Sequence, residues 1–161
     1  MPRLDPANLR VILHDLPVEM ARDAGGEPRL VGKPQDVLGL LGRLRDHEAT
    51  SMRRLVDLTA IDRGGQAGRF EIVYVLQSPT TKAGLRVHVG LDGVDPEIDS
   101  VVGLWACADW LEREVFDLFG IVFRGHPDLR RILLAPDFEG APLRRDFPRQ
   151  PGTRSPEGGG R

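Results

Sequence analysis

The sequence predicts an α/β fold of the α+β type, in which helices cover a small, mainly antiparallel sheet and a long irregular arm follows. Three strand-like segments between residues 52 and 91 are joined by connections too short for crossover helices. Two amphipathic helical segments flank them and can cover the apolar face of the sheet. We therefore expect a core domain at 1–123, an extended docking arm at 124–148 and a disordered tail at 149–161.

The first 46 residues contain a weak strand signal and a clear helix signal. Apolar residues alternate over positions 8–15, which predicts a short strand, and a turn-prone stretch follows at 23–28. Pro34 is a good first helical residue. The positions after it place apolar side chains at i, i+3, i+4 and i+7, which predicts an amphipathic helix with a stripe of Val37, Leu40, Leu41 and Leu44.

The middle of the chain predicts three strands at 52–61, 69–77 and 85–91. The second is rich in residues that favour strands, and the third alternates strictly, with one apolar face made by Leu85, Val87, Val89 and Leu91. A glycine-rich loop at 63–68 separates the first two strands, and the connections favour an antiparallel meander.

The second helix is the best-signalled element. Asp109 with Glu112 three residues later forms a capping box, and Gly120 stands where a helix-terminating glycine belongs. The buried stripe between these signals is expected to contain Leu111, Val115, Leu118 and Phe119.

Composition argues against a cofactor or metal bound by this chain alone, and against a membrane span. The single cysteine, Cys107, cannot supply the ligands of a zinc or iron–sulfur site, and the four histidines lack metal-ligand spacing. The longest uncharged apolar run, 101–108, is far shorter than the ~20 residues of a membrane helix. No signal peptide is recognised at the start, so we expect a cytosolic protein.

Residues 124–148 combine apolar anchors with paired arginines. Of the 22 basic and 24 acidic residues of the chain, 8 and 5 lie in residues 124–161, and all eight basic residues there are arginine. Arginine suits flat, bidentate pairing with carboxylates. A segment with this much apolar surface and no core of its own is expected to lie on a protein partner, with a protease-sensitive region after Phe123.

Two other classes of function remain possible from the residues alone. Glu114 and Asp117 are helical neighbours and could form a general acid/base pair in a stand-alone enzyme, or a polar face that meets arginines, as Arg113 and Asp117 would at i, i+4. The pairs at 130–131 and 144–145 could grip nucleic-acid phosphates, but the slightly acidic chain and the interleaved carboxylates favour protein recognition. His126, which precedes a proline, is expected to act as a hydrogen-bonding pin.

Three motifs resemble a known family. The sequence WLEREVFDLFGI begins at residue 110, HPDLRRIL begins at residue 126, and GAPLRRDFP begins at residue 140. Together they resemble the C-type subunit of proton-pumping NADH–quinone oxidoreductase, respiratory complex I. A looser resemblance extends back to about residue 30, and homologous subunits of hydrogenase-type and other ferredoxin- or deazaflavin-linked membrane complexes remain an alternative.

The resemblance implies a peripheral-arm subunit on the cytoplasmic side of the membrane, with no redox centre of its own. NADH, FMN, iron–sulfur clusters and quinone would be bound by other subunits. The implied partners are the homologue of the D-type subunit, which helps to form the quinone cavity, and neighbouring iron–sulfur subunits, not nucleic acid. The complex would catalyse NADH:quinone oxidoreduction with proton translocation, whereas the isolated chain would not be catalytic.

The resemblance also assigns interface and structural roles, but no catalytic, cofactor or metal ligand, to individual residues. Matching positions in the helix and arm motifs are Glu112, Arg113, Glu114, Asp117, His126, Arg130, Arg131, Arg144, Arg145 and Asp146. Ala141 departs from the family pattern, in which a histidine is common at this position.

Overall fold

The computed structural model describes residues 4, 6–22, 26, 28–65, 68–93 and 95–148. The expected tail at 149–161 and most of the turn at 23–28 lie outside the described residues. The elements, in chain order, are α1 (Pro6–Ile12), β1 (Glu19–Arg22), β2 (Pro28–Gly32), the 3₁₀ turn η1 (Pro34–Asp36), α2 (Val37–Asp46), β3 (Arg54–Asp62), β4 (Phe70–Gln77), β5 (Gly84–Leu91), β6 (Glu97–Asp99), α3 (Ala108–Phe119) and β7 (Val122–Arg124).

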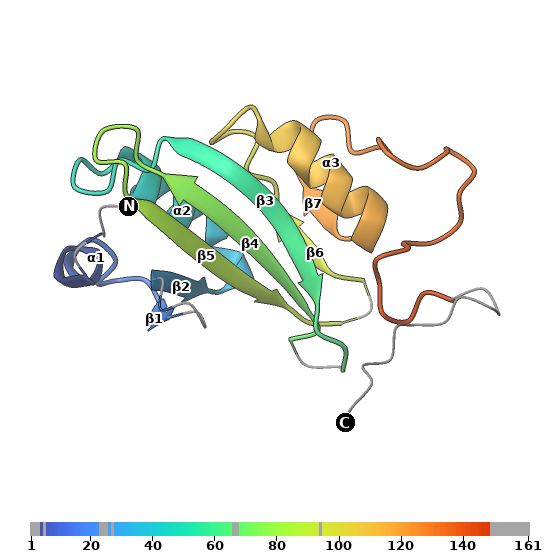
Figure 1. Cartoon of the computed structure of the whole chain (residues 1–161), viewed down its shortest axis with the longest axis horizontal. Helices are drawn as coiled ribbons and strands as arrows, with labels where there is room; N and C mark the ends of the chain where they lie inside the picture. The colour runs from blue at the N-terminus through green and yellow to red at the C-terminus, as the bar shows by residue number, and fades with distance from the viewer. Residues whose placement is uncertain are drawn as a thin grey trace, which may run out of the picture.

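The main sheet has five strands in the order β1-β2-β5-β4-β3 (Figure 1). The predicted meander of β3, β4 and β5 is confirmed, since both strand pairs are antiparallel. The hairpin of β1 and β2 joins the sheet through a parallel pairing of β2 with β5. Strands β6 and β7 form a separate parallel pair. The fold is therefore of the predicted α+β type, with a mainly antiparallel sheet.

The core lies between the sheet and the helices. The inward residues of β4 and β5 alternate along the strands and are almost fully buried, and the four predicted stripe residues of α2 are 0% exposed. Gly32 allows α2 to lie close to β2, because a Cβ atom there would come within 2.7 Å of Leu40 Cδ2. Helix α3 packs against β3, as the cover of an apolar sheet face requires.

The N-terminal prediction was wrong, because residues 6–12 form helix α1 and not a strand. Leu9, Ile12 and Leu13 are buried at helical spacing, whereas Val11 is 73% exposed. Alternation of three residues was a weak signal, and the buried set follows a period of 3.6. The short strands β1, β2, β6 and β7 also have no clear signal in the sequence.

After Arg124, the last residue of β7, the described chain contains no further helix or strand. We call residues 124–148 the arm. It leaves the α3–β7 unit and loops away before it returns towards the β3–β4 hairpin (Figure 1). None of the helices in the described part of the chain is long and apolar enough to cross a membrane.

Candidate functional site

The arm is attached to its own domain along α3. His126 contacts Asp109 near the start of the helix, and the carbonyl of Arg130 accepts a hydrogen bond from Arg113 Nε at 3.3 Å one turn later. Further along, the backbone N–H of Leu143 donates to the carbonyl of Leu118 at 3.0 Å. The arm therefore follows α3 from its N-terminal to its C-terminal end.

Asp117 is the main attachment point in the middle of the arm. Its carboxylate is fully buried, and Oδ1 accepts a hydrogen bond from Arg131 Nη1 at 2.7 Å. Oδ2 accepts three backbone N–H groups at 2.8–3.1 Å, from Ile132, Leu133 and Leu134. Burial alone raises the pKa of Asp117, but these donors outweigh it and lower the pKa to about 2. The group is an ionised anchor that fixes three successive peptide units.

Arg131 closes the following loop. Besides Asp117, its guanidinium donates to the carbonyls of Phe138 at 2.8 Å and Gly140 at 3.1 Å, and it lies over the Phe138 ring. The Phe138 ring stacks on Phe147 at a centroid distance of 5.9 Å. One arginine thus donates to two backbone carbonyl groups of a loop that has no helix or strand to pair them.

Asp62, at the end of β3, holds the far end of the arm. Its side chain is 2% exposed and accepts hydrogen bonds from the Arg69 guanidinium and from the backbone N–H of Arg145, the latter at 2.8 Å. The Arg69 hydrogen bond is the main reason why the pKa of Asp62 falls to about 2. Arg69 also pairs with Asp146 at 2.7 Å. This cluster joins the β3–β4 hairpin to the arm.

Arg144 joins the arm to the C-terminus of α3. Its Nε donates to the carbonyl of Phe119 at 2.7 Å, where the helix dipole favours a cation. The guanidinium carbon lies 5.0 Å from the centroid of the buried Phe70 ring, and that of Arg69 lies 4.7 Å from it. Gly120, in the left-handed conformation, ends the helix directly beside the Arg144 guanidinium.

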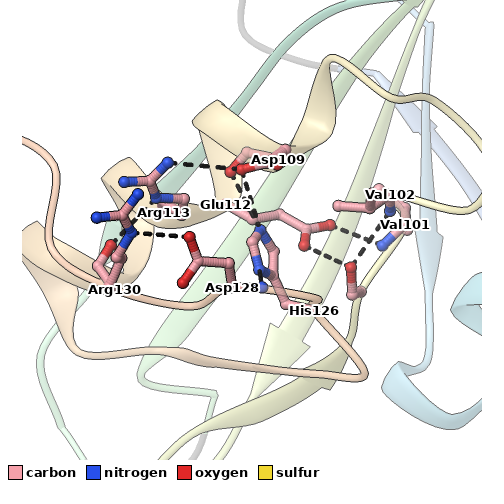
Figure 2. A network of polar contacts seen from close by, with 9 residues as sticks. Val101, Val102, Asp109, Glu112, Arg113, His126, Asp128 and Arg130 are labelled. Atoms are coloured by element: carbon pink, nitrogen blue, oxygen red, sulfur yellow. Dashed lines mark hydrogen bonds and ion pairs between the residues drawn. The ribbon is translucent and has the colours of Figure 1, made fainter.

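His126 attaches the start of the arm. Its ring is fully buried, and Nε2 donates to the Asp109 carbonyl at 3.2 Å (Figure 2). Nδ1 accepts the backbone N–H of Asp128 at 3.0 Å, and Asp128 in turn pairs with Arg130 at 2.7 Å. These two contacts engage both nitrogens of the ring. The role of His126 as a hydrogen-bonding pin stays a prediction.

Glu112 holds a different segment, the turn before α3. It is 0% exposed and accepts hydrogen bonds from Ser100 Oγ and from the backbone N–H of Val101, both at 2.6 Å (Figure 2). Burial raises its pKa. The carboxylate stabilises the turn that carries the chain from β6 to α3.

The remaining helix-motif residues differ from their expected arrangement. Asp117 pairs with Arg131 and not with Arg113, whose nearest carboxylate is Asp109 at 3.8 Å. Glu114 is exposed on the outer side of α3. A carboxylate that exchanges protons with a substrate needs an accessible oxygen, whereas both oxygens of Asp117 are buried and engaged in hydrogen bonds to the arm. The geometry therefore contradicts the acid/base hypothesis.

Sequence reasoning missed Asp62, Arg69 and Phe70, which receive the far end of the arm. One signal was present. Leu58, Ala60 and Asp62 alternate along β3, so an aspartate had to lie on the buried face of the strand, where it requires a partner. Among the described residues, no group of three or more histidines, cysteines and acidic side chains could hold a metal ion.

Comparison with known proteins shows where this arrangement belongs. The sequence model of the respiratory-chain NADH dehydrogenase 30 kDa subunit matches residues 30–153. The C-type subunit of NADH-quinone oxidoreductase from Citrifermentans bemidjiense is 44% identical over 131 residues, which cover 81% of this chain and 80% of the relative. Its counterpart from Caulobacter vibrioides is 45% identical over 125 residues, which cover 78% of this chain and 63% of the relative.

Solved structures agree with the sequence comparison. A trypsin-resistant fragment of Nqo5 superposes with a TM-score of 0.64 at 30% identity, covering 76% of this chain and 97% of the fragment. A chain of an archaeal membrane-bound sulfane sulfur reductase superposes with a TM-score of 0.75 at 20% identity. The match covers 88% of this chain and 84% of that chain, and it shows a shared fold. The chain thus belongs to the family of the 30 kDa, or C-type, subunit of respiratory-chain NADH dehydrogenase.

Proposed function

We propose that this chain is a peripheral-arm subunit of a proton-translocating NADH–quinone oxidoreductase. It supports electron transfer from NADH to quinone by holding neighbouring subunits together. The reaction belongs to the complex, with NADH, FMN, iron–sulfur clusters and quinone on other subunits. The chain lies on the cytoplasmic side of the membrane and contacts the homologue of the D-type subunit and neighbouring iron–sulfur subunits.

The observation that carries the proposal is the extent of the family match. Residues 30–153 include the main body of the sheet, α3 and the whole arm. The geometry supports a structural role, because the motif residues Asp117, Arg131 and Arg144 satisfy backbone groups and fix the arm. A fixed arm presents a rigid surface, which lowers the entropy cost of binding a neighbour. Rigid placement also matters for the rate of the reaction, since misplacing a reacting group by about 1 Å can lower that rate about 100-fold.

Substitution of Arg144 in the intact complex tests this role. Arg144→Ala leaves the Phe119 carbonyl without its charged donor, a loss of about 1.5–3 kcal/mol, so we expect several-fold less assembled complex on a native gel. Arg130→Ala should have a smaller effect, because the Arg130–Asp128 pair is on the surface. Arg54→Ala, at an exposed site on β3, is the matched control and should assemble normally.

Two results would contradict the proposal. Normal assembly of Arg144→Ala with an altered rate of the redox step would indicate a direct catalytic role. A tagged wild-type chain that fails to co-purify with NADH–quinone oxidoreductase subunits in mild detergent would exclude membership of the complex.

A further inference from the structure

The outer side of α3 has an unusual composition for a helix surface that faces water. Cys107, Trp110, Glu114 and Leu118 lie at i, i+3, i+7 and i+11, on one side of the helix. Of these, the Cys107 thiol lies 3.9 Å from the Leu55 carbonyl, and Leu118 is partly buried against the core. Trp110 is 63% exposed, and Glu114 is the only charged side chain among the four. The outward arc of a helix on a soluble protein is normally polar. Here it exposes the large apolar ring of Trp110 one turn before Glu114.

The arm, which is bound along α3, also carries exposed apolar side chains. Leu133 is 60% exposed and Leu143 is 52% exposed, and their backbone N–H groups are bound to Asp117 and Leu118 of α3. Three of the seven exposed large apolar side chains of the described residues therefore lie on α3 and the arm. We call the six residues Cys107, Trp110, Glu114, Leu118, Leu133 and Leu143 the α3–arm surface. Apolar groups gathered in this way are typical of an interaction site.

The unpaired charges beside this surface are negative. The arm is rich in arginine, but Arg131 and Arg144 are directed inward to Asp117 and to the end of α3, and Arg130 is paired with Asp128. By contrast, the exposed carboxylates of Glu114, Asp137 and Glu139 form no hydrogen bond or ion pair within the described residues.

Arg145 is the exception among the arginines. Its guanidinium has no acidic partner in the described part of the chain, but the side chain lies across Gly64 in the β3–β4 hairpin, away from the α3–arm surface. The sequence predicts a protein partner for the arm without specifying its charge. At this surface the contacts favour a basic one.

We propose that the α3–arm surface binds an apolar segment of a neighbouring subunit that presents a lysine or arginine to Glu114. The inference rests on the proposed function and adds the chemistry of the partner. Trp110 is the anchor, because aromatic side chains dominate binding energy at protein interfaces. The indole is already positioned, with the guanidinium carbon of Arg113 5.2 Å from the ring centroid. The partner's cation then neutralises a carboxylate that has no internal partner.

The single cysteine of the chain provides a direct test. Cys107 is exposed and lies one turn from Trp110 on the same arc. A maleimide reagent should label Cys107 in the purified chain and label it at least about tenfold more slowly in the intact complex. The control replaces Cys107 by serine and introduces Val56→Cys, since Val56 is 50% exposed on β3. That control cysteine should remain reactive in both states. Equal labelling of Cys107 in both states would overturn the proposal.

A crosslinker that joins cysteine to lysine identifies the partner's chemistry. From Cys107 it should capture a lysine of another subunit, and peptide mass spectrometry should place that lysine beside apolar residues. Protection of Cys107 without any crosslink to another subunit, together with unchanged binding of Glu114→Lys, would refute the basic partner.

Substitutions separate this inference from the proposed function. In complex reconstituted from the purified chain, Trp110→Ala should weaken retention at least about tenfold, and Glu114→Lys should weaken it more than Glu114→Gln. Val56→Ala and Glu97→Lys are the matched controls for apolar truncation and charge reversal at other exposed sites. If the wild-type chain does not join the complex, the proposed function fails. If the chain joins but Trp110→Ala and Glu114→Lys bind normally, only the docking surface is wrong.

Discussion

Two buried aspartates explain how an irregular segment keeps a fixed shape. Asp117 binds three backbone N–H groups and a guanidinium, and Asp62 binds Arg69 and the backbone of Arg145. A buried donor left without its acceptor costs about 1–3 kcal/mol, so each carboxylate stabilises several groups that cannot pair elsewhere. At the scale of single residues, the arm depends on these two sites more than on its exposed apolar anchors.

Replacement of Asp117 by asparagine should loosen the centre of the arm. The amide can accept fewer of the four hydrogen bonds, so we expect the local opening free energy to fall by about 2 kcal/mol. Amide hydrogen exchange of residues 132–134 should then accelerate by up to about thirtyfold at neutral pH. Asp137→Asn, at an exposed position of the same arm, is the control and should leave this exchange unchanged.

The same substitution has a pH signature. The folded-state pKa of Asp117 is lowered from 3.8 to about 2, so its stabilising contribution is complete above pH ~4 and is lost as the pH falls through 2. A shift of this size corresponds to about 2 kcal/mol. Wild type should therefore lose protection of residues 132–134 over this range, and Asp117→Asn should show little such loss. An identical acid profile in both proteins would contradict the role of the carboxylate.

At the scale of elements, the arm is a loop closed by its own side chains. The segment between Arg131 and Gly140 is fastened by one guanidinium, and the stacked rings of Phe138 and Phe147 close it from outside. Gly140 has φ = 90° and lies against Phe147, so both its backbone and its missing side chain matter. The conformation thus depends on glycine at this position.

Alanine at Gly140 should separate packing from backbone strain. A Cβ atom there would come within 2.9 Å of Phe147 Cε2, in addition to the cost of a left-handed alanine. Gly125 also has a positive φ, at 79°, but a Cβ atom there meets nothing within 4 Å. We expect Gly125→Ala to destabilise the chain by about 1–2 kcal/mol in urea unfolding and Gly140→Ala to destabilise it more. Equal losses would indicate that the Phe147 contact carries no energy.

At the scale of the whole molecule, the arm closes a long stretch of chain. The hydrogen bond between Asp62 and Arg145 joins residues 83 positions apart in the sequence. The contacts between the arm and α3 fall within this stretch of chain. The sequence predicts a protease-sensitive region after Phe123, whereas these contacts lead us to expect protection.

Limited trypsin digestion of the isolated chain decides between these expectations. With the arm attached, cleavage after Arg131 and Arg144 should be slow, because both side chains are held against α3. Asp62→Ala should release the far end and accelerate cleavage after Arg144 and Arg145. Asp57→Ala, at an exposed position on the same strand, is the control. Rapid cleavage of the wild-type arm at Arg131 would show that the arm requires a partner to become ordered.

Local patterns in the sequence determined most of the regular structure. The stripe of α2 and the alternation of β5 each place apolar side chains on one face, and the structure buries them there. Gly120 ends α3 as predicted, but the predicted capping box of Asp109 and Glu112 was wrong. The N-cap residue is Cys107, without a side-chain cap hydrogen bond, and Glu112 instead binds Ser100 and Val101. Helix α1 was missed because seven residues are too few to separate a period of 2 from one of 3.6. The parallel pairing of β2 with β5 was missed because nothing near either strand encodes it.

The sequence by itself determined the family, the α+β class and the residue types of the arm, because motifs and periodicities are properties of neighbouring positions. Only the tertiary structure decided that Asp117 binds residues 131–134 and that Asp62 receives the arm, because these contacts join distant parts of the chain. It also decided which charges remain for a partner. Arginines dominate the composition of the arm, yet Arg131 and Arg144 are directed inward, and the exposed Arg124 and Arg130 are paired with aspartates. The carboxylate of Glu114 faces outward.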